Sequence, residues 1–289
     1  MLRRSSFLAG VSFSALVVST GSLLADGYSR GYARPVEPNW IVESNNQVGI
    51  QYKQIHFDYL ETLPDGTPFN EEVGWVPGFG VSVTLMQKWI LPRFYFNAQF
   101  SYYNGKTDYT DFVALDAKHP AIVKDLDFRF GNGFDLHRSV MVTPFLGIGY
   151  RNWYRDVLQY DETYSHGYYG AGVLLQVSPH AGLVLSADAL IGHTFDSKIK
   201  ISDIPNFAPG STLPLGDSNI IKLGLSADYA ITRSLHVNTG VEWSSFKYGE
   251  SPLDPTGSYN EPDSRTHHVA FRVGVGYAFG GRDHPAPLK

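Results

Sequence analysis

Ten charged side chains recur at alternate positions within otherwise apolar segments of the sequence. Five are acidic and five are basic, so the set is balanced in charge. A charge removed from water is tolerated when an opposite charge and hydrogen bonds satisfy it. The pattern therefore predicts a network of ion pairs in an enclosed, narrow space. Its members are Lys53, Asp125, Asp127, Arg129, Arg151, Asp188, Lys222, Asp228, Glu242 and Arg272.

A second group of residues has the right types for acid–base chemistry. It consists of Asp108, Asp111, His166, His193, His267 and His268. A carboxylate pair facing a histidine can activate water for hydrolysis, but the alternation of the sequence points His166 and His268 to one face and His193 to the other. The alternative is that these are polar side chains in contact with water.

Other chemistry finds little support. The chain has no cysteine, which excludes disulfides and thiolate metal sites, and it lacks a nucleophile elbow, a phosphate loop and a zinc-protease signature. His267 and His268 are adjacent and point to opposite faces of a strand, so they cannot chelate one metal. Asp254, Glu261 and Asp263 in segment 248–264 suggest weak calcium binding or, alternatively, a solvated loop. We expect no metal and no cofactor.

The composition limits the class of protein that positions these residues. The chain has 289 residues, of which 43% are hydrophobic, 14% aromatic and 18% charged, with a mean hydropathy of −0.17. Beyond residue 25 no segment approaches the roughly 20 apolar residues that a spanning helix needs, which excludes a helical membrane protein. The formal net charge of −5 provides no basic face for nucleic acid.

From residue 42 onward, apolar and polar residues alternate in segments that Gly, Pro, Asn, Asp and Ser clusters separate. Period-two alternation is typical of β-strands. In one segment Phe94, Phe96 and Phe100 share a face that is opposite to Asn97 and Gln99. Ten strands are predicted, near 42–58, 76–89, 93–103, 124–135, 139–152, 166–177, 181–194, 218–230, 234–247 and 265–279.

The connections between these segments alternate between short and long. Short turns are expected at 90–92, 136–138, 178–180 and 231–233, and long loops at 59–75, 104–123, 153–165, 195–217 and 248–264. This regular alternation indicates an up-and-down barrel in an outer membrane, with short turns at one end and long loops at the other. The fold class is therefore all-β, a closed antiparallel transmembrane barrel of ten strands.

The polarity of the two strand faces distinguishes a membrane barrel from a water-soluble one. A soluble barrel turns its apolar face inward, whereas a membrane barrel turns it to lipid. The ten charges would not fit a closed apolar core, and a Lys or Arg on the lipid face near mid-bilayer would cost about 2–4 kcal/mol. We therefore expect the charges in the lumen and lipid on the outside.

Aromatic residues near the strand ends support the same orientation. Amphipathic rings prefer the two membrane–water interfaces, where they form girdles. The interface aromatics expected here are Trp75, Trp89, Trp153, Trp243, Tyr277 and Phe279.

The termini complete the predicted organisation. Arg3 and Arg4, an apolar stretch from Phe7 to Val18 and a small residue at Ala25 are typical of a cleaved export signal. We expect a signal peptide over 1–25, a periplasmic lead-in over 26–41, the barrel over 42–279 and a periplasmic tail over 280–289.

The signal segment, the lead-in from Asp26 to Pro38, and strands such as Thr143–Tyr150 and Val273–Phe279 resemble the outer-membrane β-barrel superfamily of Gram-negative bacteria, including small opacity-type and porin-like surface proteins. This resemblance implies that the barrel assembly machinery recognises a terminal aromatic residue, here Phe279, although ten residues follow it. The strand number is also similar to that of the omptin proteases, whose chemistry needs a carboxylate pair and a His–Asp pair across the outer rim; we cannot place that set here.

We expect a non-enzymatic surface protein of the outer membrane, with a structural or interaction role. A barrel of about eight strands is just filled by its own side chains, so at ten strands the charged lumen should be narrow and plugged. The loops would meet an extracellular ligand or surface partner. The alternatives are a small solute or ion channel and an omptin-like or lipid-acting hydrolase at the rim.

Overall fold

The computed structural model describes residues 39–110, 116–157, 160–205 and 207–279. These form one short helix and twelve strands. The elements are α1 (Trp40–Ser44), β1 (Gln47–Thr62), β2 (Pro68–Gln87), β3 (Phe94–Thr110), β4 (Asp116–Asn132), β5 (Phe134–His137), β6 (Val140–Val157), β7 (Tyr160–His180), β8 (Leu183–Ile201), β9 (Ser211–Pro214), β10 (Asn219–Ala230), β11 (Leu235–Tyr248) and β12 (Asp263–Ala278).

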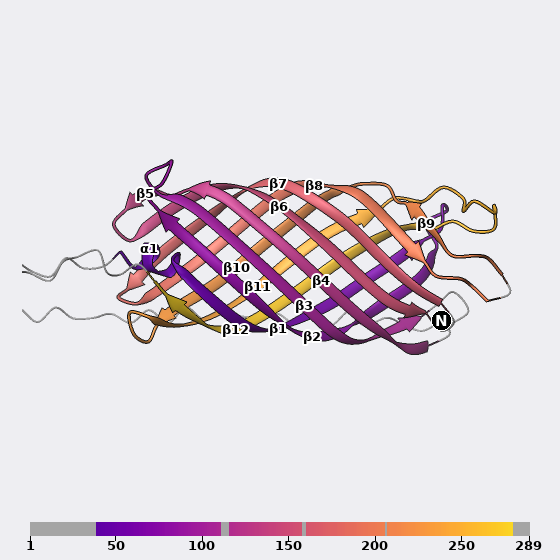
Figure 1. Ribbon diagram of the computed structural model, residues 1–289, viewed down its shortest axis with the longest axis horizontal. Helices are drawn as coiled ribbons and strands as arrows, with labels where there is room; N and C mark the ends of the chain where they lie inside the picture. The colour runs from indigo at the N-terminus through magenta and orange to yellow at the C-terminus, as the bar shows by residue number, and fades with distance from the viewer. Residues whose placement is uncertain (1–38, 111–115, 158–159, 206, 280–289) are drawn as a thin grey trace, which may run out of the picture. The chain divides into compact units, whose positions relative to one another are not determined.

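Ten of the strands close into an antiparallel barrel whose strands are tilted to its axis (Figure 1). Neighbours in the sequence are neighbours in the sheet, and β1 pairs with both β2 and β12, which closes the ring. The two short strands are additions to the wall, since β5 pairs with β6 and β9 with β8. The predicted ten-stranded up-and-down barrel is therefore confirmed.

The turns gather at the end of the barrel where α1 lies, and β9 lies at the other end (Figure 1). A two-residue turn joins β7 to β8 and contains Gly182, whose φ of +80° lies in the left-handed region that glycine tolerates best. At the opposite end, Gly66 (φ +82°) closes the connection between β1 and β2.

The predicted loop boundaries are wrong, because most strands continue well into segments assigned to loops. β1 ends at Thr62 and β2 begins at Pro68, so that the expected loop 59–75 is mostly strand. The same holds for the expected loops 104–123 and 153–165. Among the described strands, two connections are long. One joins β8 to β10 and contains β9, and the other joins β11 to β12. We call this last connection, residues 249–262, the outer loop.

The first predicted strand also begins too early. Residues 42–44 belong to α1, and the strand starts at Gln47. The Asn39 side chain accepts a hydrogen bond from the Val42 backbone N–H at 3.2 Å and caps the helix. This cap stabilises a helical turn at residues 40–44, so the first strand of the barrel starts after it.

Side chains alternate between the lumen and an apolar outer band. On β6, Leu146, Ile148 and Tyr150 are exposed, whereas Met141, Thr143 and Phe145 are buried. The outward apolar run from Val140 to Tyr150 matches the roughly 9–11 residues with which a tilted strand crosses a bilayer. The wall beyond this apolar band carries polar side chains outward, so the strands extend past the lipid-facing level on the loop side.

A bulge in β8 reverses this alternation near the outer end. Asp196 has a φ of +51°, and the pairing of β7 with β8 shifts between Ser165 and Gly167. After the bulge Ser197 and Ile199 face inward, where even-numbered residues did before it.

A glycine on β6 makes room for one of the large rings inside the barrel. A Cβ at Gly149 would lie 2.4 Å from the ring of Tyr168, and the Tyr168 hydroxyl bonds to Asp127. Glycine at this position thus makes room for a buried aromatic side chain that lies over β6 and reaches Asp127 on β4.

Candidate functional site

The charges predicted for the lumen all lie there, buried or partly buried. In the middle of the barrel, Arg129 pairs with Asp188 at 2.9 Å and Lys222 with Asp127 at 2.7 Å. Glu242 joins the two pairs, lying 3.8 Å from Arg129 and 3.4 Å from Lys222. These five side chains form one ionic layer across the lumen, which we call the middle layer.

The other five predicted charges lie above or below this layer. Arg151 forks onto Asp125 through two hydrogen bonds of 2.6 and 2.7 Å. Lys53 donates to Ser101 at 2.6 Å, and Asp228 pairs with His236 at 2.6 Å. Arg272 lines a polar cavity of about 120 Å³ between the middle layer and the turn end.

The turn end of the lumen is closed by the residues that follow α1. Asn45 donates to Gln176 at 2.6 Å, which ties the chain before β1 to β7 across the barrel. Asn46 donates to the carbonyl of Met86 and accepts from its N–H, each at 3.0 Å. These buried amides form a floor beneath the polar cavity.

The loop end of the lumen is filled around a single buried arginine that the sequence did not single out. Arg155 on β6 is 2% exposed. Its guanidinium donates to Glu162 at 2.6 Å, to Glu61 at 2.9 Å and to Glu72 at 3.2 Å. A fourth glutamate, Glu261 of the outer loop, is also buried there. We call these five residues the arginine cluster.

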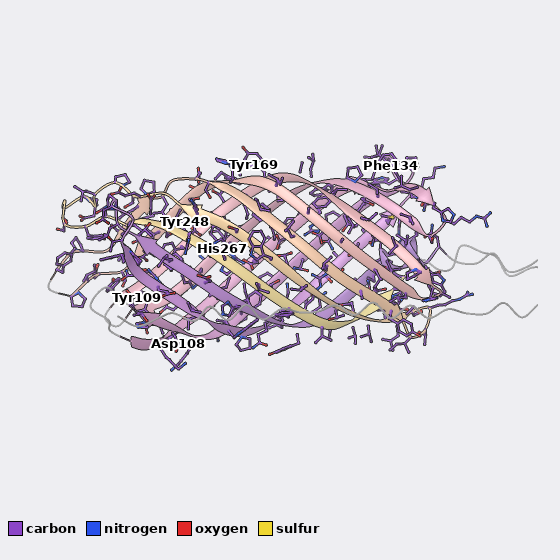
Figure 2. The ribbon with its side chains drawn as sticks, turned by 180° about the vertical axis from the view of Figure 1, so that it is seen from behind. Asp108, Tyr109, Phe134, Tyr169, Tyr248 and His267 are labelled. Carbon is purple, nitrogen blue, oxygen red and sulfur yellow. The ribbon has the colours of Figure 1, made fainter. Side chains whose placement is uncertain are left out.

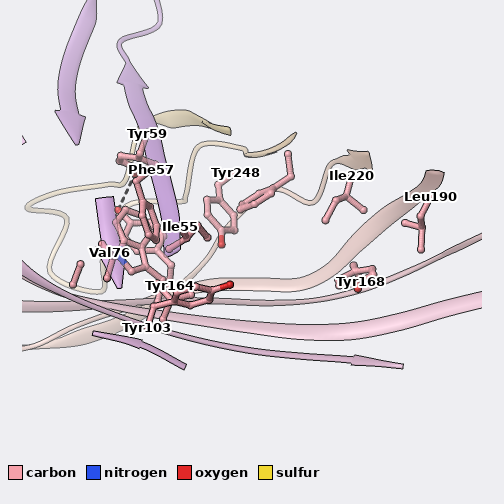
Figure 3. Close-up of a cluster of buried hydrophobic side chains, with 14 of the residues drawn as sticks. Ile55, Phe57, Tyr59, Val76, Tyr103, Tyr164, Tyr168, Leu190, Ile220 and Tyr248 are labelled. Atoms are coloured by element: carbon pink, nitrogen blue, oxygen red, sulfur yellow. Dashed lines mark hydrogen bonds between the residues drawn. The ribbon is translucent and has the colours of Figure 1, made fainter. Parts of the chain in front are cut away.

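Aromatic side chains surround the arginine cluster and link its members. Tyr164 accepts from Arg155 at 2.8 Å and donates to Glu261. Tyr59 donates to Glu61 at 2.8 Å and lies within hydrogen-bond distance of Tyr164 at 3.1 Å. Figure 3 shows Tyr59, Tyr164 and Phe57 gathered in this part of the core, with Tyr248 beside them. The lumen is therefore filled from the cavity to the outer mouth.

The cluster lies beyond the apolar band, where outward neighbours on the same strands are polar, such as Asp156 and Thr163. Burial raises the pKa of Glu261 well above its ordinary value, and the charges of Glu61 and Glu162 raise it further. Burial also raises the pKa of Glu162, although the Arg155 guanidinium opposes the shift. One guanidinium cannot neutralise four carboxylates, so Glu162 and Glu261 favour retaining their protons.

Trp153 corrects the predicted set of interface aromatics. It is 3% exposed and lies inside the barrel, where its ring stacks on Tyr164 with centroids 5.1 Å apart. Its odd number places it on the same inward face of β6 as Arg151 and Arg155. Nearness to a strand end suggested an interface position, but the alternation decides the face.

The other predicted aromatics lie outside or at the turn end. Trp75, Trp89 and Tyr277 are 44%, 72% and 55% exposed. Trp243 is partly exposed and stacks on the outward His267, with centroids 6.1 Å apart. Phe279 lies just past β12, and its N–H donates to the Asn46 carbonyl at 2.8 Å.

The described members of the group considered for acid–base chemistry do not come together at one position. His166 and His268 face inward, as the alternation predicts, but His166 bonds to Tyr248 at 2.7 Å and His268 contacts Arg151. His193 is outside, and Asp108 pairs with Lys118 at 2.7 Å on the exposed outer wall. Figure 2 shows Asp108 and His267 at separate positions along the barrel. Asp111 lies outside the described residues, as do 1–38 and 280–289.

The acids of the outer loop do not converge on a cation. Asp254 accepts hydrogen bonds from the backbone N–H groups of Thr256, Ser258 and Tyr259, which lower its pKa to about 2. Glu261 points into the arginine cluster, and Asp263 accepts from the Glu250 N–H at 2.7 Å. In this arrangement the three acids lie apart and do not surround one position. Within the part of the chain that the structure describes, His, Asp and Glu form no group arranged to hold a metal.

These features define the class of protein. An antiparallel barrel with tight turns at one end, an apolar outer band and a charged lumen is a β-barrel of the outer-membrane type. Among the described residues, no helix is long and apolar enough to cross a membrane.

Comparisons with known proteins agree with this class. No family model matches the chain, and no curated protein matches it. Among solved structures, the outer membrane protease OmpT from Escherichia coli is similar, with a TM-score of 0.55 and 10% identity over 81% of this chain and 95% of OmpT. The outer membrane protein OprG from Pseudomonas aeruginosa matches with a TM-score of 0.36 and 12% identity over 82% of this chain and 99% of OprG. Likeness at such identity shows the fold alone.

Proposed function

We propose that this protein is a non-conducting surface protein of the bacterial outer membrane, with a structural or interaction role. The observation that carries the proposal is the filling of the lumen on both sides of the polar cavity. Buried amides close the turn end, ion pairs cross the middle, and the arginine cluster with its aromatic neighbours fills the outer end. A lumen filled in this way acts as a structural core.

The part of the barrel beyond the apolar band is the surface available to extracellular partners. There the wall extends outward on most strands and carries exposed charged residues such as Lys118, Lys200 and Lys247. Binding sites on barrels commonly lie on loops and rims that a rigid scaffold positions. Outer-membrane lipid, the assembly machinery and an extracellular ligand remain the expected partners.

Hydrolysis at the rim is not the function that we infer. His166 is enclosed with Tyr248 and His268 with Arg151, so neither faces an open position where a water and a substrate could meet. The alternative function is passage of small ions. The observation that favours it is the polar cavity inside the lumen, between the floor and the middle layer.

Conductance in planar bilayers tests the proposal. The refolded chain should give no stable current steps at either polarity, while an open general porin in the same membrane gives large ones. Heat-modifiable gel mobility of the same sample must show that the barrel is folded. Stable steps from the folded chain would overturn the proposal and favour the channel.

A further inference from the structure

One glutamate of the outer loop reaches into the barrel mouth. Two further contacts link the loop to the connection between β8 and β10, since Tyr259 bonds to Ser211 at 2.7 Å and Gly249 pairs with Gly216. The loop forms a hairpin, in which the Ser251 N–H donates to the Glu261 carbonyl at 2.9 Å and the Glu261 N–H to the Ser251 hydroxyl at 2.8 Å. From this hairpin the Glu261 side chain turns inward and accepts from Tyr164, with Tyr59 at 3.5 Å. The loop and the inner wall thus meet at a buried carboxyl group.

The charge balance around Glu261 is unfavourable when every group is ionised. Four buried carboxylates face one guanidinium, and removing an unpaired charge from water is costly. Arg155 forms ion pairs with Glu61, Glu72 and Glu162, whereas Glu261 is connected to the cluster through the hydroxyls of Tyr164 and Tyr59. Glu261 is therefore the member with the weakest compensation for its charge.

We propose that the arginine cluster is a proton-dependent latch, which holds the outer loop in the barrel mouth while Glu261 is protonated and releases it when Glu261 ionises. The latch is independent of the question of conductance, since the middle layer and the floor still fill the lumen below it.

Groups from every neighbouring element face the latch. They are Tyr59 and Glu61 of β1, Glu72 of β2, Tyr109 of β3, His119 of β4, Arg155 of β6, Tyr160, Glu162 and Tyr164 of β7, and Tyr248 of β11. Burial raises the pKa of Tyr59 and Tyr164 well above their ordinary value, so both stay neutral. Arg155 remains charged, because its pKa is raised by the surrounding carboxylates. The change in charge therefore falls on Glu261 and Glu162, the two carboxyl groups whose pKa is raised.

The direction of the pH dependence follows from the raised pKa of Glu261. A group with a higher pKa in the closed state than in the open state binds more protons when closed. Protonated Glu261 therefore stabilises the closed loop. This stabilisation is complete below pH 4.5, the ordinary pKa of a glutamate, and it is lost as the pH rises from 4.5 through the raised pKa of Glu261. Each unit of that shift changes the ratio of open to closed loop by about tenfold.

A spin label on the loop measures the release directly. The chain has no cysteine, so that Ser258→Cys, at an exposed position of the loop, gives a single labelling site. In folded protein in neutral-lipid vesicles, the mobile fraction of the label should be small at acidic pH and rise by about tenfold or more toward alkaline pH. A mobile fraction that does not change with pH would overturn the latch.

Two variants separate Glu261 from general effects of pH. In Glu261→Gln the loop should stay closed throughout, because the amide cannot ionise. In the control Glu250→Gln, which changes an exposed glutamate of the same loop outside the cluster, the wild-type response should persist. Persistence of the full response in folded Glu261→Gln would contradict the proposal.

A third variant tests the latch if Glu261→Gln does not fold. Glu162→Gln removes one of the negative charges that raise the pKa of Glu261. The pKa of Glu261 is then raised less, so the rise of the mobile fraction with pH should be smaller and should level off at a lower pH than in the wild type. A rise as large as in the wild type, or one that continues to higher pH, would contradict the proposed electrostatic cause.

Discussion

At the scale of single residues, Arg155 has the largest expected effect on stability. It is buried, and three glutamates depend on its guanidinium for their ion pairs. Removing one partner from a buried ion-pair network typically costs about 3–5 kcal/mol, since the remaining charges stay buried and unpaired. Arg155→Met should therefore lower the urea midpoint of unfolding strongly at neutral pH, measured by gel mobility of vesicle-embedded protein.

The matched control for this prediction is Arg265→Gln. Arg265 is exposed on the outer face of β12, where a surface substitution usually changes stability by less than about 0.5 kcal/mol. The effect of Arg155→Met should also shrink in acid, since protonated glutamates no longer need a counter-charge. Equal midpoints for the two variants at neutral pH would show that Arg155 is not a stabilising centre.

The same residue shows what sequence reasoning missed about the site. The ten predicted lumen charges lie in the segments that alternate apolar with polar residues. Arg155, Glu61 and Glu162 lie where the outward face also becomes polar, so the apolar contrast is lost and the segments resemble loops. The sequence does contain a sign of the inward position of Arg155. Arg151, Trp153 and Arg155 follow one another two positions apart, so on a continuous strand all three side chains lie on the same face. Glu261 is in a loop, and its inward turn depends on tertiary contacts that no local pattern contains.

At the scale of elements, the sequence predicts the strands well on the lipid-facing side and poorly beyond it. Inside the apolar band, hydrophobic residues mark one face and fix the register. Outside it, water solvates the outer face, and β3 or β7 continues for many residues with polar side chains outward. The helix α1 was missed for a different reason, because residues 42–46 have too few positions to distinguish a helical turn from a strand start.

The floor after α1 gives a prediction at this scale. The Asn46 side chain bonds to the backbone of Met86 and to the Val42 carbonyl, at 2.7 Å for the latter. Asn46→Ala leaves buried backbone groups unsatisfied, which costs about 1–3 kcal/mol. Hydrogen exchange should speed up in α1 and at the Met86 amide, while the middle of the barrel is little changed. Asn104→Ala, at an exposed position of β3, should leave exchange in both regions unchanged. Unchanged exchange in Asn46→Ala would show that Asn46 does not hold the floor.

At the scale of the whole barrel, the distribution of polarity is the reverse of that in a soluble protein. Apolar side chains such as Ile50, Leu223 and Val273 are about half exposed, whereas Arg129, Lys222 and Arg155 are inside. The alternation alone cannot state which face meets which medium. The ten charged residues indicate the orientation, because ionisable groups can pair with one another in a lumen but do not fit an apolar core.

Membrane depth can be tested with two substitutions on one outward face of β6. Leu146 is 66% exposed within the apolar band, and Asn152 lies on the same face beyond Tyr150. An arginine on the lipid face costs about 2–4 kcal/mol at mid-bilayer and about 0–1 kcal/mol near the interface. In lipid vesicles Leu146→Arg should therefore destabilise the barrel by that larger amount and Asn152→Arg only slightly, as judged by urea titration. Because neither side chain enters the lumen, a similar loss in both variants, or none at Leu146, would mean that this face does not lie in lipid at the depth inferred.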